Sequence, residues 1–114
     1  MSEAAAEKLR TICLGLPEAE EVAMRPGPSY RVAEKIFANE RRHDGRISVW
    51  CKAPPGSQAV LLGADSQRFF SPPYYGPRGW VGMRLDQGPD WAGVEAFVKR
   101  SFRLVAPKRL AGCL

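Results

Sequence analysis

The sequence predicts a single α+β domain in which an antiparallel β-sheet carries helices on one face. Helical periodicity marks three segments of the 114-residue chain, and alternating apolar and polar residues mark strands between them. Strands and helices do not alternate regularly enough for a doubly wound parallel sheet, so an antiparallel sheet covered on one face is the better interpretation. The length suits one domain spanning residues 1–114.

The N-terminal third is predicted to form a helix and two extended stretches. From Ala5 to Leu16 apolar residues recur at helical spacing, and Gly15 and Pro17 end the helix. Residues 20–24 are predicted as a short strand and residues 30–37 as an extended stretch beside it. A turn is predicted at residues 43–45, which read His-Asp-Gly.

The clearest strand covers residues 46–52. Its apolar residues Ile47, Val49 and Cys51 alternate with a second set that includes Trp50 and Lys52. One face of this strand is therefore apolar, and the other carries a tryptophan and a base.

A helix is predicted next, with Ser57 as its N-cap and with Val60, Leu61 and Ala64 facing inward. Residues 66–71 are a candidate strand, and the proline- and glycine-rich residues 72–79 form a linker. In residues 80–85 alternation returns, with Trp80 and Arg84 on the less apolar side. Asp90 is predicted to cap a last helix whose core stripe is Trp91, Val94, Val98 and Phe102, and Pro107 ends it.

Charge is distributed unevenly along this basic chain, which has a net charge of +5. Residues 1–24 hold five acids and two bases, whereas residues 25–114 hold seven acids and fifteen bases. Twelve of the seventeen bases are arginine, which suits bidentate phosphate or carboxylate contacts. Such a surface attracts nucleic acid or another polyanion, although a merely solvated surface has the same composition.

The composition predicts a cytoplasmic protein without a membrane segment. No apolar run reaches the ~20 residues that a membrane span needs, and the N-terminus lacks the pattern of a secretory signal. The three cysteines are odd in number and lack CxxC spacing, and Cys13 and Cys51 lie at apolar-periodic positions typical of buried free thiols.

Four segments resemble one known family. They are PSYRVAEKIFA at 28–38, ISVWCK at 47–52, SPPYYGPRGWVGMRL at 71–85 and SFRLVAPKRLA at 101–111. In this order and spacing they resemble the MmcQ/YjbR-like proteins, which are small bacterial single-domain proteins. The resemblance implies an α+β fold comparable to that of frataxin-like proteins, and a DNA-binding role. Many members have a segment rich in histidine and lysine where this chain has Tyr75 to Gly79, so Arg78 would have to replace a lysine contact.

The strongest candidate binding residues lie on two strands and on the linker between them. If the two strands are neighbours, Trp50, Lys52, Trp80 and Arg84 share one face of the sheet, where they could stack on bases and hold phosphates. The alternative is that this face is covered and the tryptophans belong to the core. Arg78, between a proline and a glycine, could bring a guanidinium and backbone amides to a phosphate, or could simply lie in a connecting loop.

Two further groups of bases complete the candidate nucleic-acid surface. Arg31 and Lys35 could extend it, or could pair with Glu18 and Glu34. On the last helix Lys99, Arg100 and Arg103, continued by two bases of the tail, either contact the DNA backbone or form a solvated face.

Enzymatic chemistry is not expected. The single histidine, His43, has no paired nucleophile, and no cluster of His, Cys or carboxylates suits a metal. No cofactor is therefore expected. The sequence favours a DNA-binding protein; the alternative is a module that binds a protein partner or a small anion and has no enzymatic activity.

Overall fold

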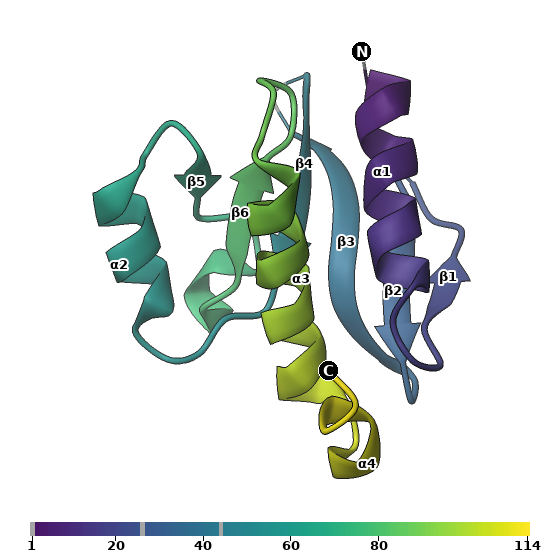
Figure 1. The fold of residues 1–114 in the computed structure, drawn as a ribbon. Helices are drawn as coiled ribbons and strands as arrows, with labels where there is room; N and C mark the ends of the chain where they lie inside the picture. The colour runs from purple at the N-terminus through teal and green to yellow at the C-terminus, as the bar shows by residue number, and fades with distance from the viewer. Residues whose placement is uncertain (1, 26, 44) are drawn as a thin grey trace.

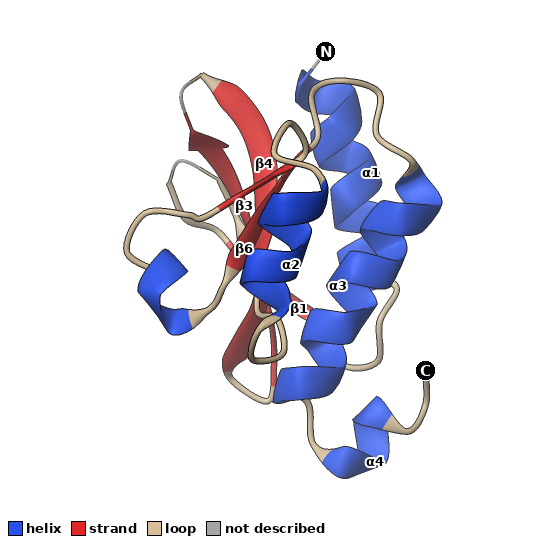
Figure 2. Cartoon of the chain, turned by 90° about the vertical axis from the view of Figure 1, so that its left-hand side faces the viewer, coloured by secondary structure: helices blue, strands red, loops and turns tan. Residues whose placement is uncertain are grey.

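The computed structural model describes residues 2–25, 27–43 and 45–114, and within these ranges it contains one antiparallel β-sheet. The strands are β1 (Glu20–Val22), β2 (Ser29–Val32), β3 (Lys35–His43), β4 (Arg46–Cys51), β5 (Phe69–Phe70) and β6 (Val81–Arg84). They lie in the order β1-β2-β3-β4-β6-β5. The helices α1 (Ser2–Leu14) and α3 (Trp91–Val105) lie on one face of the sheet, as Figures 1 and 2 show. The predicted α+β class is confirmed.

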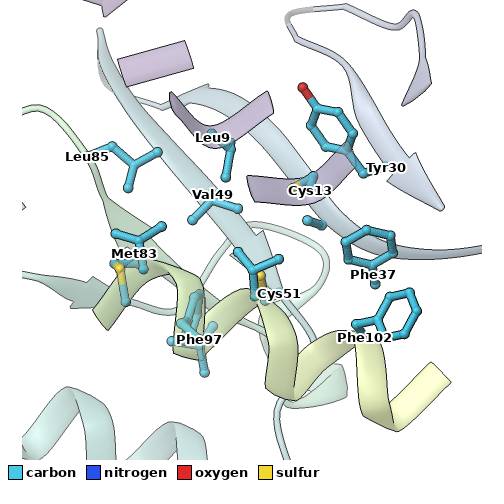
Figure 3. Packing of buried hydrophobic residues seen from close by; sticks show 14 of the residues in the cluster. Leu9, Cys13, Tyr30, Phe37, Val49, Cys51, Met83, Leu85, Phe97 and Phe102 are labelled. Atoms are coloured by element: carbon cyan, nitrogen blue, oxygen red, sulfur yellow. The ribbon is translucent and has the colours of Figure 1, made fainter. Parts of the chain in front are cut away.

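The hydrophobic core lies between this face of the sheet and the two helices (Figure 3). Helix α1 buries the stripe expected from its periodicity, with Leu9 and Cys13 fully enclosed. On β4 and β6 the alternate residues Ile47, Val49, Cys51, Val81 and Met83 are buried on the same side. The predicted apolar faces of both strands are therefore confirmed.

Helix α3 is anchored at both ends as well as along its apolar stripe. The Asp90 carboxylate accepts a hydrogen bond from the backbone N–H of Ala92 at 3.1 Å, which confirms the predicted N-cap. Near the other end, the Ser101 hydroxyl donates to the carbonyl of Phe37 at 2.6 Å and accepts from the backbone N–H of Lys52 at 3.0 Å. This buried serine fixes α3 against the ends of β3 and β4.

The stretch 30–37, expected to be continuous, is instead a hairpin between β2 and β3. Its two turn residues, Ala33 and Glu34, both have positive φ angles, 50° and 67°. Two-residue hairpin turns of this kind normally carry Asn or Gly, because other side chains strain the left-handed conformation. The prediction was wrong here because Ala and Glu give no turn signal.

Helix α2 (Ser57–Ala64) has the predicted start but a different cap, and of the residues predicted to face inward only Leu61 does so. Gly56, with φ 86°, is the N-cap residue, and no side chain caps the helix. Val60 is 69% exposed and Ala64 is exposed as well, whereas Leu61 and Leu62 are the residues packed toward the core. A helix of two turns gives this ambiguity because a shift of one residue rotates the apparent inner face by about 100°.

The remaining strand predictions are confirmed with shorter bounds. The expected strands at 20–24, 66–71 and 80–85 correspond to β1, β5 and β6. Two short helical segments were not predicted: the 3₁₀ turn η1 (Gly76–Arg78) and α4 (Lys108–Ala111). In the part of the chain that the structure describes, no helix has the length and apolarity to cross a membrane.

Candidate functional site

Part of the sheet face opposite α1 and α3 is covered by aromatic side chains from β4, from β5 and from the segment that leads into β6. These residues, which we call the aromatic layer, are Trp50, Phe70, Tyr75 and Trp80. The ring of Tyr75 lies 5.9 Å from that of Trp50 and 5.1 Å from that of Trp80, centroid to centroid, and Phe70 meets Trp50 edge-on at 6.4 Å. These are favourable geometries for aromatic pairs, so the layer forms a second small core.

Two local features hold the segment 70–80 against the sheet. Gly82 on β6 leaves the space that the Phe70 ring occupies, and a Cβ atom at this position would overlap that ring. From α2, the side-chain amide of Gln58 donates hydrogen bonds to the carbonyls of Gly76 at 2.9 Å and Trp80 at 2.7 Å. The proline-rich segment is thus tied to the sheet on one side and to α2 on the other.

The aromatic layer corrects the expected role of the two tryptophans. Trp50 and Trp80 do lie on the same face of the sheet, as predicted. Each is buried, however, with exposed fractions of 7% and 6%. Bases cannot stack on rings that are already enclosed, so in this conformation neither tryptophan offers a binding surface. The sequence could not show this, because the residues that cover them come from a loop.

The antiparallel register separates the two bases that were grouped with these tryptophans. Trp50 pairs with Gly82, and Ser48 pairs with Arg84. Two residues beyond Trp50, the same register places Lys52 beside Trp80. This is the end of the β4–β6 pair away from Arg84. Lys52 and Arg84 consequently cannot contribute to one compact site.

Lys52 instead borders a cleft of about 480 Å³ at the end of the sheet, which we call the basic cleft. It is lined by Glu34, Lys35, Ile36, Lys52, Tyr75, Arg78, Trp80 and Val105. These residues come from the β2–β3 hairpin, the end of β4, the segment 70–80 and the end of α3. Four of the predicted site residues, Lys35, Lys52, Arg78 and Trp80, are therefore brought together here.

The three cations of the cleft are available to an anion. Lys35, Lys52 and Arg78 are all exposed, and across the ranges 2–25, 27–43 and 45–114 none of them forms an ion pair. The Arg78 guanidinium lies over the ring of Tyr75, 5.5 Å from its centroid, which orients it without neutralising it. Ser101 fixes the backbone of Lys52. Glu34 is the one acid in the lining.

The other predicted bases lie elsewhere and have other partners. Arg84 borders a second cleft with Arg46 and Arg68, and its guanidinium lies over Phe70 while donating to the carbonyl of Gln67 at 3.1 Å. Arg31 pairs with Glu20 at 3.1 Å rather than with Glu18 or Glu34, because β1 lies beside β2.

The three bases predicted as a cluster on α3 have different surroundings in the structure. Lys99 pairs with Glu95 one turn away at 2.9 Å. Arg100 is half-buried, and Arg103 is exposed. These bases do not line the basic cleft, so α3 contributes only Val105 to it. Their proposed DNA contacts stay a prediction.

Sequence reasoning missed four residues that line the cleft: Glu34, Ile36, Tyr75 and Val105. Glu34 was considered only as a partner of Arg31 or Lys35, because the hairpin that presents it had no turn signal. Tyr75, the central ring of the aromatic layer, was named only as the start of the segment that replaces a histidine- and lysine-rich stretch, and its contacts with both tryptophans depend on the fold. Val105 continues the helical stripe beyond Phe102 and could have been found from it.

In the described ranges no three side chains of the His, Cys, Asp and Glu types gather as a metal site. The absence of enzymatic activity stays a prediction.

Comparison with known proteins identifies a family and a fold. The family model named YjbR matches residues 14–104. No curated protein matches the sequence. Among solved structures, the crystal structure of Deinococcus radiodurans protein DR2400, described by the family-model domain DUF419, is similar with a TM-score of 0.74. The two sequences are 20% identical, and the similarity covers 87% of this chain and 76% of the other. At that identity the likeness shows a shared fold.

Proposed function

The chain belongs to the YjbR family, and we propose that it binds DNA by holding phosphate groups in the basic cleft. The observation that carries this proposal is the convergence of Lys35, Lys52 and Arg78, from three separate segments, on one cleft without an ion pair among the described residues. Exposed, unpaired cations that contact DNA phosphates displace the counterions condensed on the DNA. The release of these ions favours binding.

The whole-chain charge supports the same proposal. A net charge of +5 raises the rate of encounter with DNA at low salt, whatever the base sequence of the DNA. The two longest helices of the described chain, α1 and α3, both pack on the sheet, so neither is free to enter a groove as a recognition helix. The proposal is therefore backbone contact rather than reading of bases in a groove.

We further propose that the layers are arranged as in frataxin-like proteins and that the protein works in the bacterial cytoplasm. A six-stranded antiparallel sheet with α1 and α3 on one face supports the first. The free, buried thiols of Cys13 and Cys51 support a reducing compartment.

The test compares two double variants that remove the same charge. Lys52→Ala/Arg78→Ala removes two of the three cations of the cleft, whereas Arg103→Ala/Lys108→Ala removes two exposed bases outside it. Binding of each variant and of the native protein to labelled duplex and single-stranded DNA is followed by anisotropy over a salt series. We expect only the cleft variant to lose affinity strongly. Its plot of log affinity against log salt should be shallower by about 1.4 to 1.8, the value for two lost phosphate contacts.

Equal losses in both double variants would mean that net charge rather than the cleft drives binding. If the native protein does not bind DNA even at low salt, the DNA proposal fails. The basic cleft would then be examined with small anions and with protein partners, which are the alternative class of ligand.

A further inference from the structure

Tyr74 stands out because its backbone is strained while its side chain is free in solvent. It is 93% exposed, and its φ angle is 66°. Positive φ is uncommon for a residue other than glycine, and residues strained in this way cluster at functional sites. No hydrogen bond or ring contact of the Tyr74 side chain occurs within the described ranges, so nothing in the fold uses the ring.

The backbone around Tyr74 is nevertheless well fixed. The N–H of Tyr75 donates to the carbonyl of Pro73 at 2.7 Å, and the N–H of Gly76 donates to the carbonyl of Pro72 at 2.7 Å. Pro72 is buried, and the next ring along the chain, Tyr75, packs between the two tryptophans of the aromatic layer. The exposed ring is thus presented in a defined position rather than at the end of a loose loop.

Tyr74 is also the one exposed aromatic residue of the protein, since all eleven aromatic positions lie in the described ranges and the other ten are buried or half-buried. It directly precedes Tyr75 and lies four residues before Arg78, and both of these line the basic cleft. The exposed ring therefore lies on the same short segment as Tyr75 and Arg78, which line the cleft whose cations can hold a phosphate backbone. This combination is typical of surfaces that bind single-stranded nucleic acid.

We propose that Tyr74 stacks on an unpaired base while the basic cleft holds the neighbouring phosphates, so that the protein prefers single-stranded DNA to duplex. This inference rests on the proposed DNA binding and specifies its substrate class. In a duplex the faces of the bases are stacked on one another and are closed to the ring, whereas in a single strand they are open. Stacking of one base on an aromatic side chain corresponds to a roughly 5- to 150-fold gain in affinity.

The experiment uses three labelled DNAs of equal length: a single strand, the same strand with abasic positions in its centre, and a duplex. The abasic strand keeps the phosphates and removes the bases. We expect the native protein to bind the single strand more tightly than the other two. Tyr74→Ala should weaken binding to the single strand by roughly 5- to 150-fold and leave binding to the abasic strand and the duplex unchanged. Tyr74→Phe, which keeps the ring, should bind like the native protein.

The result that overturns the inference is native DNA binding that does not distinguish the single strand from the abasic strand, or an equal effect of Tyr74→Ala on all three DNAs. Either outcome leaves the proposed DNA binding standing. Absence of native binding to every DNA at low salt overturns both proposals. Circular dichroism of Tyr74→Ala confirms that the fold is unchanged, as expected for a side chain that contacts nothing.

Discussion

Glu40 on β3 is a carboxylate in an unusual position for a charged residue. It is 4% exposed, and the sheet register pairs it with Val49, so both side chains point to the face that the helices cover. Burial raises its pKa, while Arg42 at 3.7 Å and the nearby Arg41 offset part of this effect. The charged run Glu40 to Arg42 thus contains a partly compensated buried charge.

Replacing this carboxylate should stabilise the protein at neutral pH. Because the pKa of Glu40 is higher in the folded than in the unfolded chain, the unfolded chain loses its proton first as pH rises above about 4.3. The native protein therefore loses stability as the pH rises through the folded-state pKa. Glu40→Gln should remove that loss, so the variant is more stable at pH 7 and similar to the native protein at pH 4.

The measurement is the free energy of unfolding in urea at pH 4 and pH 7 for the native protein and for Glu40→Gln. The exposed Glu7→Gln variant on α1 controls for the loss of one negative charge. A Glu40→Gln variant that is less stable at pH 7 would show that attraction to the two arginines outweighs burial.

Arg41, next along β3, shows how little its neighbours in sequence reveal about its environment. It is 9% exposed and donates hydrogen bonds to the carbonyls of Gly27 and Glu40 at 2.9 and 2.8 Å, while its guanidinium lies 6.0 Å from the centroid of Trp50. Nothing in the pattern of bases separates it from the exposed Arg42. Its partners lie on the loop between β1 and β2, on β3 and on β4. Only the folded chain therefore identifies it as a buried arginine.

At the scale of elements, the β2–β3 hairpin carries unrelieved strain beside the basic cleft. Its turn residues Ala33 and Glu34 both adopt the left-handed conformation, which costs about 1–2 kcal/mol for each such residue. The hairpin forms because the strands on either side are bonded in register and bury Val32 and Phe37. Tertiary burial thus overrides the local preference of the turn.

The double substitution Ala33→Asn/Glu34→Gly should therefore stabilise the protein by about 1 kcal/mol or more, because Asn-Gly is the favoured sequence for this turn. Thermal and urea unfolding measure the effect. Glu34→Ala is the matched control, since it removes the same carboxylate but keeps a Cβ in the left-handed conformation, and it should give no such gain. Loss of stability in the Asn-Gly variant would mean that the Glu34 side chain contributes contacts that outweigh the strain.

At the scale of the whole molecule, the sheet is covered on both faces by different means. Helices α1 and α3 cover one face (Figure 2), and the aromatic layer covers part of the other. Phe70 fits against β6 only because residue 82 is glycine. The aromatic layer, the basic cleft and the position of Tyr74 all depend on this one fit between the segment 70–80 and the sheet.

Gly82→Ala should consequently displace the Phe70 ring and loosen the aromatic layer. Overpacking of this kind destabilises proteins by about 1–3 kcal/mol, and the emission of Trp50 and Trp80 should shift to longer wavelength as water reaches them. Gly63→Ala on α2, where a Cβ meets nothing within 4 Å, is the matched control and should leave the emission unchanged. An unchanged spectrum and stability in Gly82→Ala would show that the layer does not depend on this contact.

The amino-acid pattern was enough to predict the α+β class, the order of most elements, the Asp90 cap and the apolar faces of α1, α3, β4 and β6. These features follow from periodicity and capping within single segments, so no partner is needed to infer them. The four resembling segments also identified the family that the match over residues 14–104 confirms.

Which of the predicted residues meet in space depends on the folded chain and could not be read from the pattern. The antiparallel register separates Lys52 from Arg84, the segment 70–80 buries Trp50 and Trp80, and an unmarked hairpin brings Lys35 to Lys52 and Arg78. Periodicity states which face of a strand is apolar, but it contains no information about what packs against the other face. That choice depends on contacts between residues far apart in the chain, and those contacts leave Tyr74 as the exposed ring beside the basic cleft.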